Sequence, residues 1–504
     1  MNFDKLIKIK TFGDLKKSGY LTRSIKTELR ENLILLLKDK KNGFPGIIGF
    51  EDTVLPEIET AILSKHSILL LGLRGQAKTK IARGIVNLLD EYIPYIEGSE
   101  LSDDPFAPIS WFGRNEIEKK GDQTPIAWLA RADRYTEKLA TPDVTVADLI
   151  GDVDPIKAAT LRLPYSDERV IHYGLISRSH RGIFVINELP DLQARIQVSL
   201  FNILQEADIQ IRGFRLRLPL DVQFIFTANP EDYTNRGSIV TPLKDRIESQ
   251  ILTHYPKTIA ISRLITEQEA SLEKEQSDKI FIPNLLKDLV EQVAFEARGS
   301  EFIDKKSGVS ARLTISAFQN MVSAAERRLL INGESSTTVR ITDTLGIIPA
   351  ITGKIELVYE GELEGPAKVA ATLIGKAIKT MLPDYFPNPD KAKKLKDKNP
   401  YNPIVVWFSE GNSLELLDSM SDKDYAKALH KVPGLKYLVE KNYPKEPASV
   451  QLLYMEFILH GLAENSLLSK NFLENGFEFK DMFQSLFNAE LDEDDLDLGD
   501  GKYN

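Results

Sequence analysis

A glycine-containing loop between an apolar run and a helical pattern constrains this chain more than any other feature. Ser67–Leu71 is a short apolar run of the kind that forms a buried parallel strand. The loop Gly72-Leu73-Arg74-Gly75-Gln76-Ala77-Lys78-Thr79 follows at once, and Ile81, Ile85 and Leu88 then recur at helical spacing. A strand, a glycine loop and a helix with Lys-Thr at its start form the context of a phosphate-binding loop. Considered alone, the loop also fits an ordinary strand-to-helix turn.

If the loop binds phosphate, its residue types have defined roles. Backbone N–H groups of the loop and of the following helix would face the β-phosphate. Lys78 would neutralise β- and γ-phosphate oxygens, and Thr79 can ligand Mg²⁺. ATP and Mg²⁺ are therefore the expected cofactors. The residues expected to bind the nucleotide are Gly72, Gly75, Gln76, Ala77, Lys78 and Thr79.

Ala77 departs from the usual pattern, because it stands where a second glycine normally lies. A methyl group is tolerable at this position if the local φ is negative. Ala77 is therefore a blemish in the match to the loop pattern.

Two further apolar runs end in polar residues suited to nucleotide hydrolysis. Gly182–Ile186 predicts a second buried strand that delivers Asn187 and Glu188 at its carboxyl end, where ligands bind in parallel α/β sheets. Glu188 is suited to orient and polarise the attacking water. Val222–Ala228 predicts a third strand, which ends in Asn229, an amide suited to hold that water or the γ-phosphate.

Two arginines follow in the order that such a fold requires. They are Arg246, in Pro242-Leu243-Lys244-Asp245-Arg246, and Arg312, in Ser310-Ala311-Arg312-Leu313. Each one alone is most simply a solvated surface residue. The loop, the two polar strand ends and the arginines occur in the order that such a fold requires. These four ordered matches around one sheet favour a functional interpretation of the arginines.

Residues 40 to 335 resemble the AAA+ ATPases of the magnesium-chelatase I-subunit and MoxR group. Asp148–Asp154 resembles the second strand of that family and the start of the insert in its second helix, and His172–Gly182 resembles the approach to its Walker B strand. Ile209–Pro219 resembles the hairpin that the group inserts before sensor 1, and its alternation about Gly213 independently predicts a β-hairpin. The arginines of this hairpin either line a pore or are solvated: Arg212, Arg215 and Arg217.

The resemblance implies a role for each candidate residue. It makes Lys78 and Thr79 the Walker A pair, Glu188 the catalytic Walker B acid, Asn229 sensor 1, Arg246 the arginine finger and Arg312 sensor 2. A finger supplied to a neighbouring subunit predicts that an isolated subunit is a poor ATPase. The family usually forms six-membered rings, so a hexamer is expected.

Asn187 is the main mismatch with the family, which usually carries aspartate at this position. An amide oxygen can accept a hydrogen bond from a Mg²⁺-bound water but brings no negative charge, so metal affinity and turnover are expected to fall. Because Glu188 is retained, slow hydrolysis is expected rather than none.

Together these patterns predict an α/β fold with a P-loop AAA+ core, a parallel sheet, a helical lid domain and an additional, mainly helical C-terminal region. The predicted divisions are residues 1–45, a helical segment with Leu29, Leu33, Leu36 and Leu37 on one face; 46–256, the core; 257–337, the lid; 338–488, the C-terminal region; and 489–504, an acidic disordered tail.

Two polar stretches of the C-terminal region invite a functional interpretation. The lysine-rich segment Asp390–Pro403 is predicted to be an exposed loop. Asp418–Ser421 follows the apolar run Ile404–Phe408 as the motif of a metal-dependent adhesion site would, but its serine spacing is wrong, which favours a helix cap.

Composition narrows the class of protein. The 504 residues are too many for one hydrophobic core, and no apolar run approaches the roughly 20 residues that span a bilayer. The chain has no cysteine, so cytoplasmic localisation is the simplest expectation. A formal net charge of −10 makes nucleic acid an unlikely partner.

The leading functional hypothesis is a chaperone-like ring motor that remodels a protein partner. Members of the resembled group work with a separate protein that carries a von Willebrand A domain, and this chain has no such domain of its own. The alternatives are the ATPase subunit of a magnesium chelatase acting on a porphyrin, and a non-hydrolysing ATP-gated scaffold. A bacterial enhancer-binding transcription activator is a fourth option, although neither its substrate-loop motif nor a terminal helix-turn-helix is visible.

Overall fold

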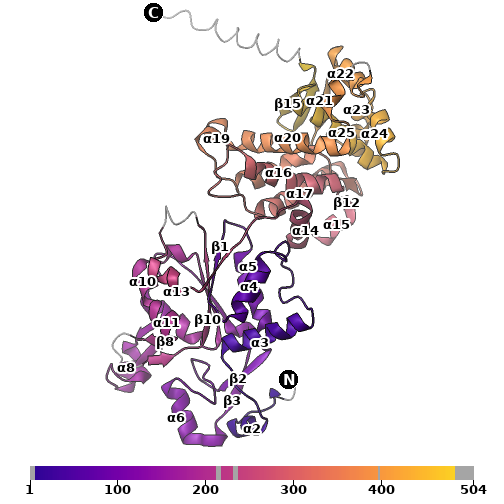
Figure 1. Cartoon of the computed structure of the whole chain (residues 1–504). Helices are drawn as coiled ribbons and strands as arrows, with labels where there is room; N and C mark the ends of the chain where they lie inside the picture. Colours follow the sequence, from indigo (N-terminus) through magenta and orange to yellow (C-terminus); the bar gives the residue numbers. More distant parts are fainter. Residues whose placement is uncertain (1–5, 212–216, 231–236, 396–397, 483–504) are drawn as a thin grey trace, which may run out of the picture. The chain divides into compact units, whose positions relative to one another are not determined.

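The chain divides into two compact units, residues 1–255 and 256–504 (Figure 1). The computed structural model describes residues 6–211, 217–230, 237–395 and 398–482. The boundary lies one residue from the predicted junction of core and lid. The predicted acidic tail lies outside the described residues.

The first unit is α/β. Its helices are α2 (Phe12–Lys17), α3 (Ile25–Lys38), α4 (Val54–Leu63), α5 (Lys78–Gly84), α6 (Trp111–Lys120), α7 (Val146–Leu149), α8 (Pro155–Leu161), α9 (Leu175–Arg178), α10 (Ala194–Ser199), α11 (Phe201–Glu206) and α13 (Thr241–Arg246). Its strands are β1 (Ile68–Leu71), β2 (Tyr92–Ile96), β3 (Ile126–Ala130), β4 (Tyr135–Leu139), β5 (Gly151–Val153), β6 (Ile171–Tyr173), β7 (Gly182–Asn187), β8 (Asp208–Gln210), β9 (Arg217–Pro219), β10 (Val222–Ala228) and β11 (Ser249–Leu252).

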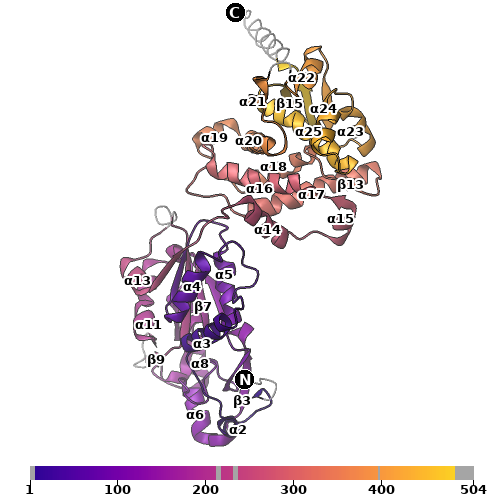
Figure 2. The ribbon, with the colours of Figure 1, turned by 45° about the vertical axis from the view of Figure 1, so that its right-hand side comes forward.

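A five-stranded parallel sheet organises this unit, in the order β11-β1-β10-β7-β4. Alternate residues of its central strands enter two different cores. Ile68 and Leu70 face α3, α4 and α5, whereas Leu69 and Leu71 face α10, α11 and α13. Figure 1 and Figure 2 show these two helical layers on opposite sides of the sheet. Burial on both faces explains why the central strands are nearly continuous apolar runs.

The second strand of this sheet was predicted wrongly. The prediction placed it at Asp148–Asp154, but β5 there pairs antiparallel with β6, outside the main sheet. The second strand in chain order is β4, which pairs with β7 and lies at the sheet edge. Its sequence, Tyr-Thr-Glu-Lys-Leu, carries polar side chains because an edge strand is not buried on both faces, and it therefore lacks the apolar signal of its neighbours.

The N-terminal segment is built into the first unit. Leu29 and Leu33 of α3 are buried as predicted, but Leu37 is 41% exposed, so its assignment to the same face was wrong. Glu28 of α3 receives two hydrogen bonds of 2.7 Å from the Arg134 guanidinium, and both side chains are almost fully buried. Breaking such a pair leaves an uncompensated buried charge, so this contact holds α3 against the start of β4.

The second unit is mainly helical. Its helices are α14 (Ile259–Glu269), α15 (Lys274–Lys279), α16 (Asn284–Gly299), α17 (Arg312–Asn332), α18 (Ile348–Thr352), α19 (Tyr359–Glu364), α20 (Pro366–Tyr385), α21 (Pro389–Lys393), α22 (Asn402–Ser409), α23 (Asp422–Leu429), α24 (Leu435–Asn442) and α25 (Ala448–Glu464). Its strands are β12 (Ile280–Phe281), β13 (Thr337–Thr338), β14 (Leu414–Leu417), β15 (Ser469–Leu473) and β16 (Gly476–Lys480). One hydrophobic core runs from α16 and α17 through α20 and α25 to β16, so residues on both sides of 338 share it.

The structure differs from the prediction for one polar stretch of this unit and agrees with it for the other. The segment Asp390–Pro403 is not simply an exposed loop, because α21 ends within it and Ala392 and Tyr401 are buried. The predicted helix cap is confirmed: the Ser421 hydroxyl accepts a hydrogen bond from the Asp424 N–H at the start of α23.

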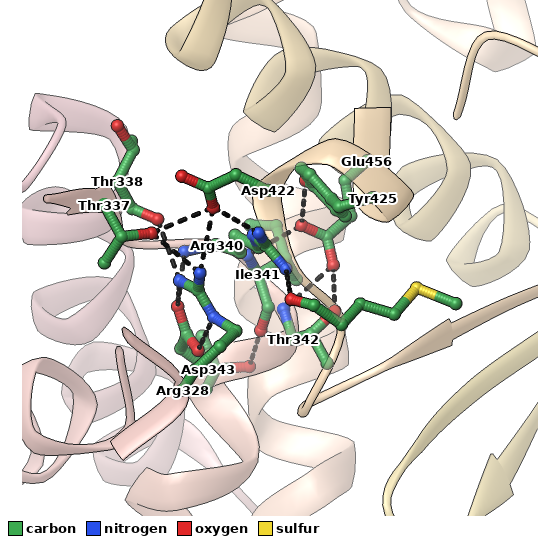
Figure 3. Close-up of polar contacts among 12 residues, drawn as sticks. Arg328, Thr337, Thr338, Arg340, Ile341, Thr342, Asp343, Asp422, Tyr425 and Glu456 are labelled. Atoms are coloured by element: carbon green, nitrogen blue, oxygen red, sulfur yellow. Dashed lines mark hydrogen bonds and ion pairs between the residues drawn. The ribbon is translucent and has the colours of Figure 1, made fainter. Parts of the chain in front are cut away.

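A buried polar network joins α17 to the C-terminal helices (Figure 3). The Arg328 guanidinium donates hydrogen bonds to Asp343 at 2.9 Å and to Thr337 at 2.7 Å. The Glu456 carboxylate of α25 accepts from the N–H groups of Ile341 and Thr342, both at 2.9 Å. Each buried polar group named here therefore has a partner.

Within the described part of the chain, no helix combines the length and the apolar character needed to cross a membrane.

Candidate functional site

The predicted site lies at the carboxyl edge of the parallel sheet. Leu71, the last residue of β1, is in register with Ala228, the last residue of β10. On the other side of β10, Phe226 is in register with Ile186 of β7. The residues that follow these three adjacent strand ends are the Gly72–Thr79 loop, Asn229 and the Asn187-Glu188 pair. The sheet therefore brings together three groups that the sequence places up to 157 residues apart.

The glycine loop wraps around its own lysine. The Lys78 ammonium donates hydrogen bonds to the carbonyl oxygens of Gly72 and Leu73, the latter at 3.1 Å, and its side chain is buried. Gly75 has φ +72°, and Lys78 is the first residue of α5. The lysine therefore lies on the concave side of the loop, where the phosphate oxygens of a nucleotide would bind.

Ala77 adopts a left-handed conformation, with φ +57° and ψ +15°. The condition for an unstrained methyl group, a negative φ, is therefore not met. The loop keeps the geometry for which a glycine is usual, and the Ala77 methyl group is accommodated at a cost in conformational energy.

The end of β7 presents the two residues predicted for metal and water. Asn187 is its last residue, and Glu188 has φ +55° and ψ +53°, which turns the chain sharply after the strand. The Thr227 hydroxyl links them: it donates to Asn187 Oδ1 at 3.2 Å and accepts the Glu188 N–H at 3.2 Å. Thr227 therefore orients both residues, a role that the sequence did not reveal.

Asn229 follows β10 directly and is only 2% exposed. A buried amide one residue beyond the strand end, beside the loop after β1, fits the predicted contact to water or to the γ-phosphate.

The chain just after β11 also contacts the loop. The Thr253 hydroxyl donates to Gln76 Oε1 at 2.8 Å, and the Tyr255 hydroxyl donates to the Arg74 carbonyl at 2.9 Å. A Cβ added to Gly72 would lie 1.9 Å from Thr253 Oγ1, so only glycine fits at this position. Gln76 was predicted to bind the nucleotide, which stays a prediction, and its side-chain oxygen contacts Thr253.

An ion pair anchors the helix after the loop. Arg83 of α5 pairs with Glu137 of β4, with Nε and Oε2 3.2 Å apart. The hydrogen bond from Arg83 holds the pKa of the Glu137 carboxyl below its ordinary value. The pair fixes α5 against the sheet edge.

Arg246 lies at the end of α13 and contacts α11. Its Nε donates to Gln205 Oε1 at 3.1 Å, and its guanidinium carbon lies 4.9 Å from the centre of the Phe201 ring. Its Nη1 atom donates to the Pro242 carbonyl at 2.8 Å. These contacts fix the direction of the side chain within its own subunit. Its role as a finger for a neighbouring subunit stays a prediction.

Arg312 is the first residue of α17 in the second unit, and its backbone N–H donates to the Ser310 hydroxyl at 3.1 Å. Its predicted action on the nucleotide stays a prediction. Of the hairpin before sensor 1, β8 and β9 pair antiparallel as predicted. Arg217 there forms an ion pair of 3.4 Å with Asp208. Arg212 and Arg215 lie outside the described residues.

The donor set fits Mg²⁺ bound together with a nucleotide. Within the described ranges, no three His, Cys, Asp or Glu side chains cluster in a way that would hold a metal ion by themselves. A hydroxyl at Thr79 and an amide oxygen at Asn187 are hard oxygen ligands or water acceptors, which Mg²⁺ accepts alongside phosphate oxygens. These two residues could therefore hold the metal.

The comparisons with known proteins concern this unit most directly. The family model of the sigma-54 interaction domain matches residues 165–251, a range that includes Glu188, Asn229 and Arg246. An archaeal Lon protease from Thermococcus kodakarensis is 29% identical over 182 residues, which are 33% of this chain and 27% of that protein. The chain thus spans about a quarter of the length of this curated relative.

Solved structures are similar at low identity. NtrX from Brucella abortus has a TM-score of 0.37 at 14% identity, with 69% of this chain and 66% of that chain covered. A model of the complex between magnesium-chelatase subunits BchI and BchD has a TM-score of 0.33 at 18% identity, with 64% and 98% covered. The predicted fold class is confirmed in its architecture, an α/β unit with a parallel sheet and a second, mainly helical unit. The P-loop AAA+ assignment and membership of the MoxR group stay predictions.

Proposed function

We propose that this chain is an ATP-hydrolysing AAA+ motor that works as a ring, most simply a hexamer, and remodels or assembles a protein partner. The resemblance to the magnesium-chelatase I-subunit and MoxR group supports a separate partner protein with a von Willebrand A domain. The client itself is a protein in this proposal.

One observation carries the proposal: the glycine loop, Glu188 and Asn229 follow three adjacent parallel strands at one edge of the sheet. If the loop were only a strand-to-helix turn, there would be no need for a buried lysine, a carboxylate and an amide at the same edge of the sheet. ATP hydrolysis requires all three, because phosphoryl transfer depends on positioning and charge stabilisation.

Each group then has a task that follows from its chemistry. Lys78 stabilises charge on the β- and γ-phosphate oxygens, and Glu188 orients the attacking water and accepts its proton. Asn229 holds the water or the γ-phosphate by hydrogen bonds. When bound, Mg²⁺ neutralises phosphate charge. Thr79 and Asn187 are the residues that we propose to contact it.

A second candidate function rests on Asn187. Its Oδ1 atom accepts a hydrogen bond from Thr227 at 3.2 Å and carries no formal charge, so the metal shell lacks the carboxylate that the resembled family supplies. This favours a scaffold that changes state when ATP binds and does not turn over. The motor and the scaffold differ only in whether phosphate is released.

The test compares three full-length proteins: wild type, Glu188→Gln and Lys78→Ala. The motor predicts that wild type releases phosphate, that Glu188→Gln binds ATP and retains it, and that Lys78→Ala binds no nucleotide. Phosphate release is followed in single- and multiple-turnover assays, and binding with a fluorescent ATP analogue.

If wild type binds ATP but releases phosphate no faster than Glu188→Gln, the scaffold replaces the motor as the proposed function. If Lys78→Ala binds the nucleotide as tightly as wild type does, the glycine loop is not the nucleotide site. Both the motor and the scaffold would then be wrong.

A further inference from the structure

Two hydroxyl groups outside the predicted motifs contact the glycine loop from the chain segment that leaves the first unit. Thr253 and Tyr255 follow β11, and Tyr255 is the last residue of the first unit. We call this segment, residues 253–255, the exit segment. Its contacts with the loop are set by the alternation of an extended chain.

Thr253 contacts Leu71, which directly precedes the loop, and Gln76 within the loop. Its backbone N–H donates to the Leu71 carbonyl at 2.7 Å, which continues the β1–β11 pairing by one residue. Its hydroxyl donates to Gln76 Oε1 at 2.8 Å, and it is 8% exposed. The absence of a Cβ at Gly72 is what allows this approach, since an added Cβ would lie 1.9 Å from Thr253 Oγ1 and 2.2 Å from Gln76 Oε1.

Tyr255 fixes the middle of the loop. Its hydroxyl donates to the carbonyl oxygen of Arg74 at 2.9 Å. Arg74 directly precedes Gly75, whose φ of +72° is part of the turn that surrounds the Lys78 ammonium. A hydrogen bond to this carbonyl therefore restrains the peptide plane next to the turn.

His254, between the two, is held on the other side. Its Nε2 atom lies 2.8 Å from Thr53 Oγ1, and its ring lies 5.0 Å from the ring of Phe50 in an edge-to-face arrangement. The exit segment is thus clamped between the residues that precede α4 and the glycine loop. A displacement of the Gln76 side chain or of the Arg74 carbonyl would therefore change the hydrogen bond of Thr253 or of Tyr255.

We propose that Thr253 and Tyr255 are positioning residues for nucleotide binding, and that their hydroxyl groups report the state of the glycine loop to the chain that enters the second unit. The proposal rests on the proposed nucleotide site and adds a route from it: loop, exit segment, Pro256 and the residues beyond. The coupling passes through the covalent chain and the hydroxyl contacts of Thr253 and Tyr255.

The test uses two substitutions that remove a hydroxyl and little else, Tyr255→Phe and Thr253→Val, in the full chain. Tyr401→Phe is the matched control, because the Tyr401 hydroxyl also donates to a backbone carbonyl, that of Pro387 at 2.6 Å, within the second unit. The dissociation constant of a fluorescent ATP analogue should rise about 2- to 12-fold in each exit-segment variant, the range for loss of one hydrogen bond, and stay unchanged in the control.

A second measurement separates positioning from simple loss of stability. Hydrogen exchange is followed in peptides that cover residues 253–258, with and without a saturating non-hydrolysable ATP analogue. In wild type and in Tyr401→Phe, the nucleotide should slow exchange in this segment. In Tyr255→Phe at full occupancy, that slowing should be lost, whereas protection of β1 and β10 should be retained.

The outcomes are distinguishable from failure of the proposed function. If wild type binds no nucleotide, the nucleotide site itself is wrong. If wild type binds and both variants match it in affinity and in exchange of residues 253–258, the exit segment has no positioning role. If Tyr255→Phe does not fold, Thr253→Val carries the same two measurements.

Discussion

The predicted site of the first unit and the polar network of the second unit differ in where their polar residues lie. In the first unit, Lys78, Glu188 and Asn229 converge at the ends of strands, at the one edge where a parallel sheet binds ligands. In the second unit, Arg328 and Asp343 are 1% and 2% exposed and lie inside the hydrophobic core, with their charges facing each other. Polar groups thus lie at strand ends in the predicted site of the first unit, whereas charged groups pair inside the core of the second unit, as Glu28 and Arg134 also do inside the first. Their position relative to the strand or helix ends, rather than their residue type, separates the two uses.

The network of the second unit also explains why residues on both sides of 338 act as one body. Arg328 on α17 and Arg340 both contact Asp422 at the start of α23, and the Arg340 guanidinium lies 4.0 Å from the ring centre of Tyr425. The Tyr425 hydroxyl donates to Glu456 of α25 at 2.7 Å. We propose that the lid and the C-terminal region move as a single part.

The largest expected effect concerns Arg246. It tests whether the nucleotide site of one subunit needs an arginine from a neighbouring subunit. If Arg246 serves a neighbouring subunit, Arg246→Ala should lower kcat by about 10³-fold or more and leave nucleotide affinity unchanged. Activity per subunit of wild type should also rise with protein concentration as rings form. Arg217→Ala is the control, because Arg217 is an exposed arginine in a surface ion pair with Asp208.

Mixing Arg246→Ala with Lys78→Ala sharpens this test. Each variant is inactive alone, but a mixed ring contains interfaces that pair an intact Lys78 loop with an intact Arg246, so some phosphate release should return. Mixed rings that are seen by mass measurement and stay inactive would assign Arg246 to its contacts with Phe201 and Gln205 in its own subunit. In that case the variant should melt at a lower temperature than wild type.

The next effect concerns the buried charge of the second unit. Arg328→Met leaves Asp343 in the core without its partner, so the second unit should lose about 3–5 kcal/mol of stability. Arg327→Met is the matched control, because Arg327 is 66% exposed and lies 3.7 Å from Asp418, a pair worth roughly 0–1 kcal/mol. Hydrogen exchange of α17 and α23 measures the loss of stability in the second unit.

Nucleotide affinity should not change in Arg328→Met at temperatures where the second unit stays folded. A tenfold loss of affinity under these conditions would mean that the network belongs to the nucleotide site, and the contrast between the units would fail.

The parts of the fold that were predictable have a strong local signal. Gly182–Ile186 and Val222–Ala228 are apolar runs because the strands are buried on both faces, and the structure places them in β7 and β10. The loop before Lys78 carries its signal in glycine spacing. Once these strands are parallel neighbours, the meeting of the predicted site residues follows from the topology.

The parts that were missed depend on contacts between distant residues. Thr227, Thr253 and Tyr255 are single polar residues with no motif, and their roles appear only when β10 lies beside β7 and β11 beside β1. The network around Arg328 joins residues up to 115 positions apart, so no local sequence spacing predicts it. β4 was missed for a different reason, because its edge position removes the apolar run that marks a buried strand.

A smaller effect is expected at Asn187, which sharpens the choice between motor and scaffold. Asn187→Asp restores a charged acceptor and keeps an oxygen for the Thr227 hydroxyl. A hydrogen bond to a charged acceptor is worth roughly 1 kcal/mol more than one to a neutral acceptor, so the Mg²⁺ concentration for half-maximal ATP binding should fall about fivefold. An unchanged Mg²⁺ dependence would place this position outside the shell of the metal.

The smallest effect is expected at Ala77, where the loop carries a side chain in a left-handed conformation with φ +57°. Ala77→Gly removes a conformational cost of about 1–2 kcal/mol in the folded loop, but it adds roughly 0.5–1 kcal/mol of entropy to the unfolded chain. The two terms oppose each other, so thermal stability of the first unit should rise by no more than about 1 kcal/mol. Ala82→Gly is the control with the opposite sign, because Ala82 lies within α5, where glycine costs about 1 kcal/mol.

A destabilised Ala77→Gly protein would mean that the methyl group makes packing contacts that outweigh its backbone strain. Nucleotide affinity would then fall together with stability, since Ala77 directly precedes Lys78, and a fluorescent ATP analogue would show both changes in one titration.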